Sequence, residues 1–337
     1  MAWDRIRGHD EPRRRLQAAF ERGRLAHAYL FVGIAGVGKR RFAVELAKAL
    51  LCERPPAPLT ACDRCPACAL VDAGTHPDFK TAGKLPDKQE LTIEVVRELC
   101  MELGQKPLRG SRKVSILDDA DDFNEESANV FLKTLEEPPA GAVLILLATS
   151  TDRQLPTILS RCQVVRFHPL NAVDMRSILA EHQVTDPTVV ARITRLAGGS
   201  ASRALALNEP AIWDFRQSFL KGLASGRPER VTLAQDWVKY TESVGKDSGD
   251  QRDRTSTVIL LITDILRAAL RISLGGTSNS LDMDDEPHLR QLAETHGPEG
   301  IALALEACLT ADQYVERRVQ LVLLIEQLVD RLCRRVV

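Results

Sequence analysis

The sequence predicts an α/β domain built on a mainly parallel sheet, followed by a small helical domain and an all-helical C-terminal domain. Three observations predict this order. Short apolar segments typical of buried strands alternate with helical patterns up to residue 170. A glycine-rich loop joins the first of these strands to a helix. After Pro169 only helical periodicity remains. We therefore expect domains over 1–170, 171–208 and 209–337.

The composition excludes several classes of protein. The chain has 45 Lys and Arg against 46 Asp and Glu, a net charge of −1, which excludes a globally basic nucleic-acid binder. Its 27% charged and 44% hydrophobic residues are typical of a globular rather than a disordered protein. No apolar run reaches the roughly 18 residues of a membrane span, and the N-terminal residues lack the apolar segment of a signal peptide. The cytoplasm is the expected compartment.

The predicted strands are segments in which apolar residues run almost without interruption, over 27–32, 114–117, 142–149 and 163–167. The predicted helices of the α/β domain cover 10–25, 41–51, 92–103 and 125–137. Three short helices are expected next, over 173–181, 187–197 and 202–207. Beyond residue 210 the clearest helical patterns cover 257–272 and 300–335, and the polar segments 246–254 and 275–286 are expected to be loops.

The glycine-rich loop has the pattern of a phosphate-binding loop. It runs from Gly33 to Lys39, follows the first strand, opens a helix and fits G-x-x-x-x-G-K. Gly33, Gly36 and Gly38 let backbone N–H groups turn inward around phosphate oxygens, and Lys39 reaches the outer phosphates. The next position normally carries a Ser or Thr whose hydroxyl binds Mg²⁺. Here it is Arg40, so the loop favours nucleotide binding over efficient hydrolysis.

Two carboxylates, Asp118 and Asp119, follow the second predicted strand. In a phosphate-loop protein the first acid in this place holds Mg²⁺, often through water, and the second can polarise the attacking water. A solvated acidic strand end is the alternative, since Asp121 and Asp122 continue the run. The phosphate loop upstream favours the nucleotide-binding interpretation.

The phosphate loop also suggests roles for Thr149 and Arg161. Thr149 ends the apolar strand 142–149 and suits a sensor of the γ-phosphate, although a polar residue at a strand end needs no such role. Arg161 follows that strand by a short loop and, taken alone, is a surface charge. In a nucleotide-binding assembly, an arginine from one subunit can stabilise the transition state in its neighbour.

Four of the eight cysteines fall in the segment 52–68: Cys52, Cys62, Cys65 and Cys68. In a reducing compartment such clustering favours a metal site over disulfides. Four thiolates make a closed tetrahedral zinc site, which is structural rather than catalytic. An iron–sulfur cluster is the alternative metal centre, and unliganded thiols are the remaining possibility.

The order of these motifs resembles that of the AAA+ subunits of the bacterial sliding-clamp loader. The shared features are the phosphate loop, the inserted cysteine cluster, the Asp-Asp strand end, the segment Leu132–Pro139 and the triplet Ser160-Arg161-Cys162. They cover residues 5–208. The resemblance implies an AAA+ phosphate-loop domain, a helical lid over 171–208 and a helical collar over 209–337 that joins the subunits of a ring.

Within this family the chain resembles the delta-prime subunits of DNA polymerase III. The segment Ala73–Asp78 and the total length carry this resemblance. The motor subunits of the family share the cysteine cluster and the Ser-Arg-Cys triplet, but they have an intact Lys-Thr in the phosphate loop where this chain has Lys39 and Arg40. In this family delta-prime is a largely rigid stator, and ATP turnover belongs to its neighbours.

The resemblance implies a role for each motif. The zinc ligands correspond to Cys52, Cys62, Cys65 and Cys68. The nucleotide-binding residues correspond to Gly33, Gly36, Gly38, Lys39, Asp118 and Asp119. The first sensor corresponds to Thr149, with Ser150 as a one-residue alternative, and the second sensor to Arg203. Arg161 corresponds to an arginine finger that acts in trans on ATP bound by the adjacent motor subunit.

The implied function is that of a stator in a pentameric ring with the motor subunits, gamma and tau, and the delta subunit. This ring uses ATP to load the sliding clamp onto primer–template DNA during replication. The alternative is an autonomous ATPase motor subunit of the same loader. Arg40 argues against that alternative, while Lys39, Asp118 and Asp119 leave the binding of ATP and Mg²⁺ open.

Overall fold

The computed structural model describes residues 2–85, 88, 90–225, 228–245, 248–277, 285–317 and 319–334. Contacts gather the chain into two compact units. One is formed by Met1–His182 with Gly198–Ser202, and the other by Gln183–Ala197 with Arg203–Val337. The expected division into three domains stays a prediction. None of the helices in the described ranges is both long and apolar enough to span a membrane.

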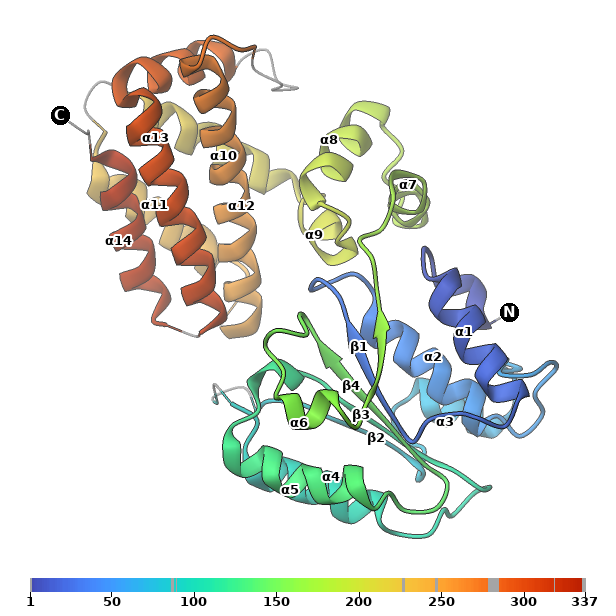
Figure 1. The fold of residues 1–337 in the computed structure, drawn as a ribbon. Helices are drawn as coiled ribbons and strands as arrows, with labels where there is room; N and C mark the ends of the chain where they lie inside the picture. The colour runs from blue at the N-terminus through green and yellow to red at the C-terminus, as the bar shows by residue number, and fades with distance from the viewer. Residues whose placement is uncertain are drawn as a thin grey trace. The chain divides into compact units, whose positions relative to one another are not determined.

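A five-stranded sheet lies at the centre of the first unit, with the order β2-β3-β4-β1-β5 (Figure 1). The strands are β1 (Ala28–Val32), β2 (Phe79–Ala82), β3 (Lys113–Leu117), β4 (Ala142–Ala148) and β5 (Gln163–Arg166). All neighbouring strands are parallel. The α/β class and the four predicted strands are therefore confirmed. The sequence missed β2, because this edge strand is only partly buried and has no apolar run.

Helices cover both faces of the sheet. The helices of this unit are α1 (Asp10–Glu21), α2 (Lys39–Leu51), α3 (Pro66–Asp72), α4 (Ile93–Leu103), α5 (Glu125–Glu136), α6 (Pro156–Leu159) and α7 (Ala172–Glu181), with short 3₁₀ turns at Ala2–Arg5 and Ala120–Asp122. Helices α4 and α5 pack together on one face, and α2 with α3 lies on the other (Figure 1).

The two covered faces explain the burial of the central strands. In β1, Leu30 packs in the same cluster as Phe131 of α5, whereas the ring of Phe31 lies 5.7 Å from that of Phe42 of α2. Neighbouring residues of one strand therefore enter two different cores. Every residue of β1, β3 and β4 is buried, as expected for a parallel sheet with helices on both sides.

The second unit is helical. Its helices are α8 (Pro187–Ala197), α9 (Ala201–Ala206, whose first two residues belong to the first unit), α10 (Pro210–Ala224), α11 (Arg230–Glu242), α12 (Ser248–Ser273), α13 (Glu286–Glu316) and α14 (Leu321–Cys333). The fully buried Trp237 lies in a core contributed by α10 to α14. The predicted helical character of the chain beyond residue 210 is confirmed.

The expected loop over 246–254 is wrong where the structure describes it. Helix α12 begins at Ser248, and residues 246–247 lie outside the described residues. The buried hydroxyls of Thr255 and Thr257 donate to the carbonyl oxygens of Gln251 and Asp253, one turn earlier. A helix can satisfy buried threonines in this way, so a polar sequence here does not prevent burial.

The pattern over 300–335 corresponds to two helices rather than one. Helix α13 ends at Glu316, and α14 starts at Leu321. Helix α13 is itself broken at Gly297, whose φ of 62° and ψ of 174° lie outside the helical region, immediately before Pro298. Proline lacks the N–H group that an unbroken helix needs at this position. Of the other expected loop, 275–286, residues 278–284 lie outside the described residues.

Candidate functional site

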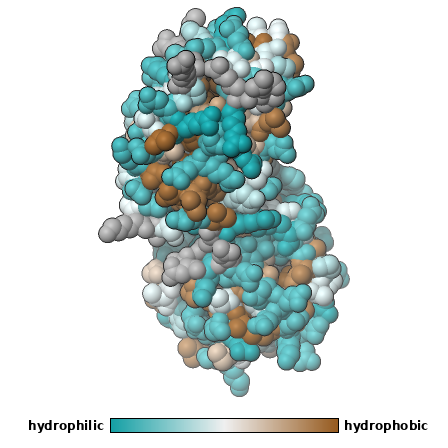
Figure 2. Space-filling model, turned by 90° about the vertical axis from the view of Figure 1, so that its left-hand side faces the viewer, coloured by the Kyte–Doolittle hydropathy of each residue, from teal (hydrophilic) through white to brown (hydrophobic). Residues whose placement is uncertain are grey.

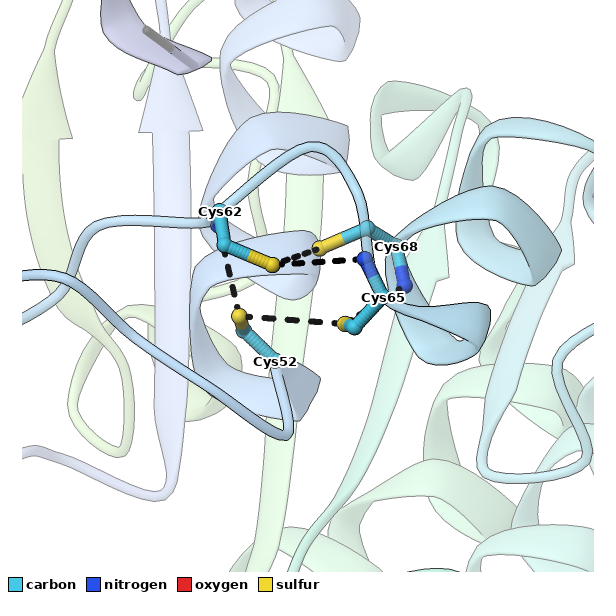
Figure 3. Close-up of side chains that lie close together, drawn as sticks. All are labelled: Cys52, Cys62, Cys65 and Cys68. Atoms are coloured by element: carbon cyan, nitrogen blue, oxygen red, sulfur yellow. Dashed lines mark hydrogen bonds between the residues drawn. The ribbon is translucent and has the colours of Figure 1, made fainter.

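The four clustered cysteines come together around one point (Figure 3). Cys52 follows the last residue of α2, Cys62 lies in the loop beyond it, and Cys65 and Cys68 lie at the start of α3. Their sulfur atoms all lie within 4.8 Å of one another, with Sγ–Sγ distances of 4.0 Å for Cys52–Cys65 and Cys62–Cys68. Thiolates held about 2.3 Å from a tetrahedral zinc ion lie roughly 3.8 Å apart. The residues present therefore fit a tetrahedral metal ion.

Backbone N–H groups surround these sulfur atoms. The N–H of Cys62 donates to Cys52 Sγ, and that of Cys65 donates to Cys62 Sγ, each at 3.3 Å. The pKa of the Cys62 thiol is lowered to about 6, chiefly because the backbone N–H of Arg64 donates to it. Such donors stabilise the thiolate, which is the form that binds metals. Because the group contains only sulfur ligands and leaves no position open, its chemistry is that of a structural site.

A buried lysine, to which no sequence motif pointed, connects this cysteine loop to α2. Lys48 Nζ lies 3.0 Å from Glu45 Oε1, 2.9 Å from Asp63 Oδ1 and 3.0 Å from Asp72 Oδ1. Burial alone lowers the pKa of Lys48, but the bonds to the three carboxylates outweigh it and raise that pKa above its usual value. Lys48 therefore connects α2, the loop between Cys62 and Cys65, and the end of α3.

Replacing Lys48 by methionine is expected to lower the free energy of unfolding by about 3 kcal/mol, because Glu45 would stay buried without its cation. The value lies at the low end for a broken buried pair, since the Asp72 side chain is 44% exposed and keeps its solvation. Urea unfolding measures the change. The exposed Lys239→Met variant is the control and is expected to unfold like the native chain. Equal stability of the two variants would contradict the proposed role of Lys48.

The phosphate loop lies between β1 and α2, and its glycines are required by both conformation and packing. Gly38 precedes α2 with a φ of 106°, a conformation that other residues rarely adopt. A Cβ atom on Gly36 would lie 1.8 Å from Ser202 Oγ, within the same unit. The carbonyl of Gly36 accepts a hydrogen bond of 2.9 Å from the N–H of Ala201. No larger side chain fits this loop at Gly36.

The loop and the strand ends form a cleft of about 330 Å³. Six of the predicted nucleotide-binding residues line it: Gly36, Gly38, Lys39, Asp118, Asp119 and Thr149. Gly33 lies at the base of the loop, where Lys39 Nζ donates to its carbonyl oxygen at 2.5 Å and to that of Ile34 at 3.0 Å. Burial lowers the pKa of Lys39. The structure thus brings together residues from three separate parts of the sequence.

The acidic residues of the cleft are each engaged by a protein donor. The guanidinium of Arg40 lies 2.9 Å from Asp118 Oδ2. The Asp119 carboxylate accepts the backbone N–H of Lys84 at 3.2 Å. Asp121, which the sequence suggested only as part of a solvated run, accepts the N–H of Thr149 at 2.6 Å and Gln154 Nε2 at 2.8 Å. No sequence signal pointed to Gln154.

Arg161 is held at the end of α6. Its guanidinium donates to Glu136 Oε1 at 2.6 Å and to the carbonyl of Thr157 and Ser160 Oγ, each at 3.1 Å. Among the described residues, Arg161 is not one of those that line the phosphate-loop cleft. Glu136 is the last residue of α5 and belongs to the Leu-Glu-Glu-Pro-Pro segment, whose sequence alone predicts no role. The structure gives it one as the positioning partner of Arg161.

Two other positions of the predicted motifs are Cys162 and Arg203. The Cys162 side chain is buried, and burial raises the pKa of its thiol to about 12, so it is an inert core residue. Arg203 is exposed on α9 and belongs to the second unit. Its role as a second sensor stays a prediction.

Comparisons with known proteins agree with these features. A family model described as DNA polymerase III, delta subunit, matches residues 8–171. DNA polymerase III subunit delta' of Pseudomonas aeruginosa is 36% identical over 221 residues, which cover 64% of this chain and 67% of that protein. The Escherichia coli subunit delta' is 30% identical over 238 residues, covering 71% and 70%.

A tau subunit is also similar, over a smaller part of its length. DNA polymerase III subunit tau of Escherichia coli is 38% identical over 199 residues, which cover 56% of this chain and 30% of that protein. The two delta' relatives match the chain over about two thirds of their own lengths, whereas tau matches over less than a third. The chain belongs to the family of DNA polymerase III delta' subunits.

Proposed function

We propose that this chain is the stator of a clamp loader, which assembles with gamma or tau motor subunits and a delta subunit into a pentameric ring. The ring would load a sliding clamp onto primer–template DNA at the expense of ATP. In this proposal the chain's own contribution to hydrolysis is Arg161, which acts on ATP bound by the neighbouring motor subunit. Zinc would occupy the four-cysteine site and hold the loop 52–68 in place.

One observation supports action in trans above all others. Arg161 is anchored to Glu136 at the end of α6 and, among the described residues, does not line the chain's own cleft. Helix α6 lies beside α5, whereas the helix that follows the phosphate loop, α2, covers the other face of the sheet (Figure 1). This placement favours action on a nucleotide bound by another subunit over action on one in the chain's own cleft.

The surface of the helical unit supports a role in assembly. Leu303, Leu309 and Leu323 are exposed on α13 and α14, and Figure 2 shows hydrophobic side chains gathered on this part of the surface. Exposed apolar groups on neighbouring helices are typical of contacts between subunits. We propose that these helices form the chain's share of the collar.

Assembly is tested by sedimentation velocity of the chain mixed with motor and delta subunits from the same source. We expect one complex that contains all three proteins. The Leu323→Asp variant is expected to weaken it, because a charge would have to be buried in the collar. The matched control is Val173→Asp, an equally exposed apolar residue on α7 outside the helical unit. A native chain that does not enter the complex would overturn the proposal.

The autonomous motor remains the alternative, supported by Lys39 and by the similarity to tau. It is distinguished by steady-state ATP hydrolysis of the isolated chain. The stator proposal expects no turnover above that of a Lys39→Ala variant. Substantial hydrolysis that this variant abolishes would favour the motor.

A further inference from the structure

The phosphate-loop cleft carries an arginine where a hydrolytic phosphate loop carries a magnesium ligand. Arg40 follows Lys39 directly, so no hydroxyl is present at the position that binds Mg²⁺ in such loops. The Arg40 guanidinium lies 2.9 Å from Asp118 Oδ2, the carboxylate expected to hold the ion. The residues present therefore do not fit a magnesium site of the usual kind.

Charge makes the same point. The Arg40 guanidinium places a positive charge beside Asp118. This guanidinium would repel a divalent cation placed beside it and would offset the attraction of Asp118. The other two carboxylates of the cleft are also engaged by protein donors, since Asp119 accepts the Lys84 N–H and Asp121 accepts the Thr149 N–H and Gln154 Nε2.

The cleft nevertheless keeps the features that bind phosphate. The glycine loop precedes the N-terminus of α2, a helix of 13 residues whose first residue is Lys39. Arg40 and Lys39 both line the cleft. The Arg40 side chain is 63% exposed, so it can turn from Asp118 to a phosphate oxygen without disturbing the core. Guanidinium groups match phosphate oxygens with paired, charge-assisted hydrogen bonds.

We infer that this cleft binds a nucleoside di- or triphosphate as the free anion, with Arg40 in place of Mg²⁺ as the counter-charge. Lys39 and Arg40 then neutralise the phosphates, while Asp118 anchors Arg40 when no nucleotide is bound. A nucleotide already complexed with Mg²⁺ carries less negative charge and brings a cation towards Arg40. Magnesium is therefore expected to leave the affinity unchanged or to lower it. This inference concerns the chain's own cleft and does not depend on Arg161 or on ring assembly.

The test is calorimetric titration of the isolated full chain with ATP and with ADP, with and without Mg²⁺. The magnesium-free buffer is passed over a chelating resin and contains no EDTA, since a soluble chelator would also take a metal from the cysteine cluster. We expect binding of the native chain without Mg²⁺ that is at least as tight as with it. Binding that requires Mg²⁺, or no binding in either buffer, would overturn the inference.

Variants assign the effect to Arg40. Arg40→Ser removes the guanidinium and restores a hydroxyl, and it is expected to weaken magnesium-free binding roughly 10- to 100-fold, the usual effect of losing hydrogen bonds from a charged group. The same variant is expected to bind more tightly when Mg²⁺ is added. Lys39→Ala should lose binding in both buffers. Arg22→Ser removes one positive charge at the exposed end of α1, outside the cleft, and should bind like the native chain.

Thermal unfolding of each variant shows whether it is folded, so that a loss of binding can be read as a local effect. If folded Arg40→Ser binds ATP without Mg²⁺ as tightly as the native chain, Arg40 is not the counter-charge and the inference fails. This outcome would leave the stator proposal untouched, because that proposal is tested by assembly and by Arg161.

Discussion

Replacing Arg161 by alanine in an otherwise native reconstituted loader is expected to reduce ATP hydrolysis at the neighbouring site on which we propose that it acts by about 10³–10⁵-fold, the usual effect of removing an arginine finger. The physical reason is that the guanidinium neutralises charge that develops on the transferred phosphoryl group. Hydrolysis stimulated by DNA and clamp is measured at steady state, and assembly is checked on the same samples. The total hydrolysis rate of the ring should fall by at least the fraction that this one site contributes.

Three further variants test whether the loss of hydrolysis is specific to Arg161. Arg161→Lys keeps the charge but loses the planar fork of donors, so it is expected to recover little activity. Glu136→Gln keeps Arg161 but weakens its anchor of 2.6 Å, and it should give a smaller loss. Arg153→Ala removes another exposed arginine of the same unit and is expected to behave like the native chain. Unchanged hydrolysis by an intact ring containing Arg161→Ala would show that Arg161 is only a surface charge.

Replacing Cys68 by serine is expected to abolish metal binding and to lower the stability of the first unit by about 4 kcal/mol or more. This value holds when the concentration of the free ion is a thousand times its dissociation constant. An ion that binds only the folded chain stabilises that chain by mass action. We choose Cys68 among the four cysteines because its side chain is buried in α3. Metal content by mass spectrometry and thermal unfolding with and without a chelator measure the two effects.

The matched control is Cys308→Ser, which changes an equally buried cysteine in the helical unit. It should keep the native metal content. The same metal analysis distinguishes zinc from iron, and a colourless protein with one zinc ion per chain is the expected result. Native chain that carries no metal and unfolds identically in chelator would contradict a structural metal site at the four cysteines.

Because binding displaces protons from the thiols, metal affinity should also fall as the pH is lowered. Burial raises the pKa of the Cys68 thiol, which makes it one of the sulfurs that hold their protons most strongly before the metal binds. A competition titration against a chromophoric chelator at several pH values measures this dependence.

Much of the site was predictable because its chemistry is local in sequence. The phosphate loop needs Gly36, Gly38 and Lys39 at fixed spacing, and each of them lines the cleft. The four cysteines also lie close in sequence, and their sulfurs meet within 4.8 Å. The central strands were recognisable because burial on both faces requires an uninterrupted apolar run, as in β4.

Elements at the margin of the core were harder to predict. The edge strand β2 is only partly buried, so its sequence need not be apolar. The start of α12 is polar, yet the buried Thr255 satisfies its hydroxyl on a carbonyl of the same helix. In both places packing against the rest of the chain decides the conformation, and local composition does not report it.

The sequence by itself determined the fold class, the family and the residue types available at each site. Only the tertiary structure decided how those residues pair. Arg40 meets Asp118 across 78 positions of the chain, and Lys48 gathers three carboxylates from α2, the cysteine loop and α3. The Lys48 group forms because folding buries the lysine, where an unpaired charge is costly, whereas the exposed Arg40 pairs with Asp118 because the fold brings the two side chains together. The distances between such paired groups depend on how the helices pack against the sheet. No single segment of the sequence determines that packing.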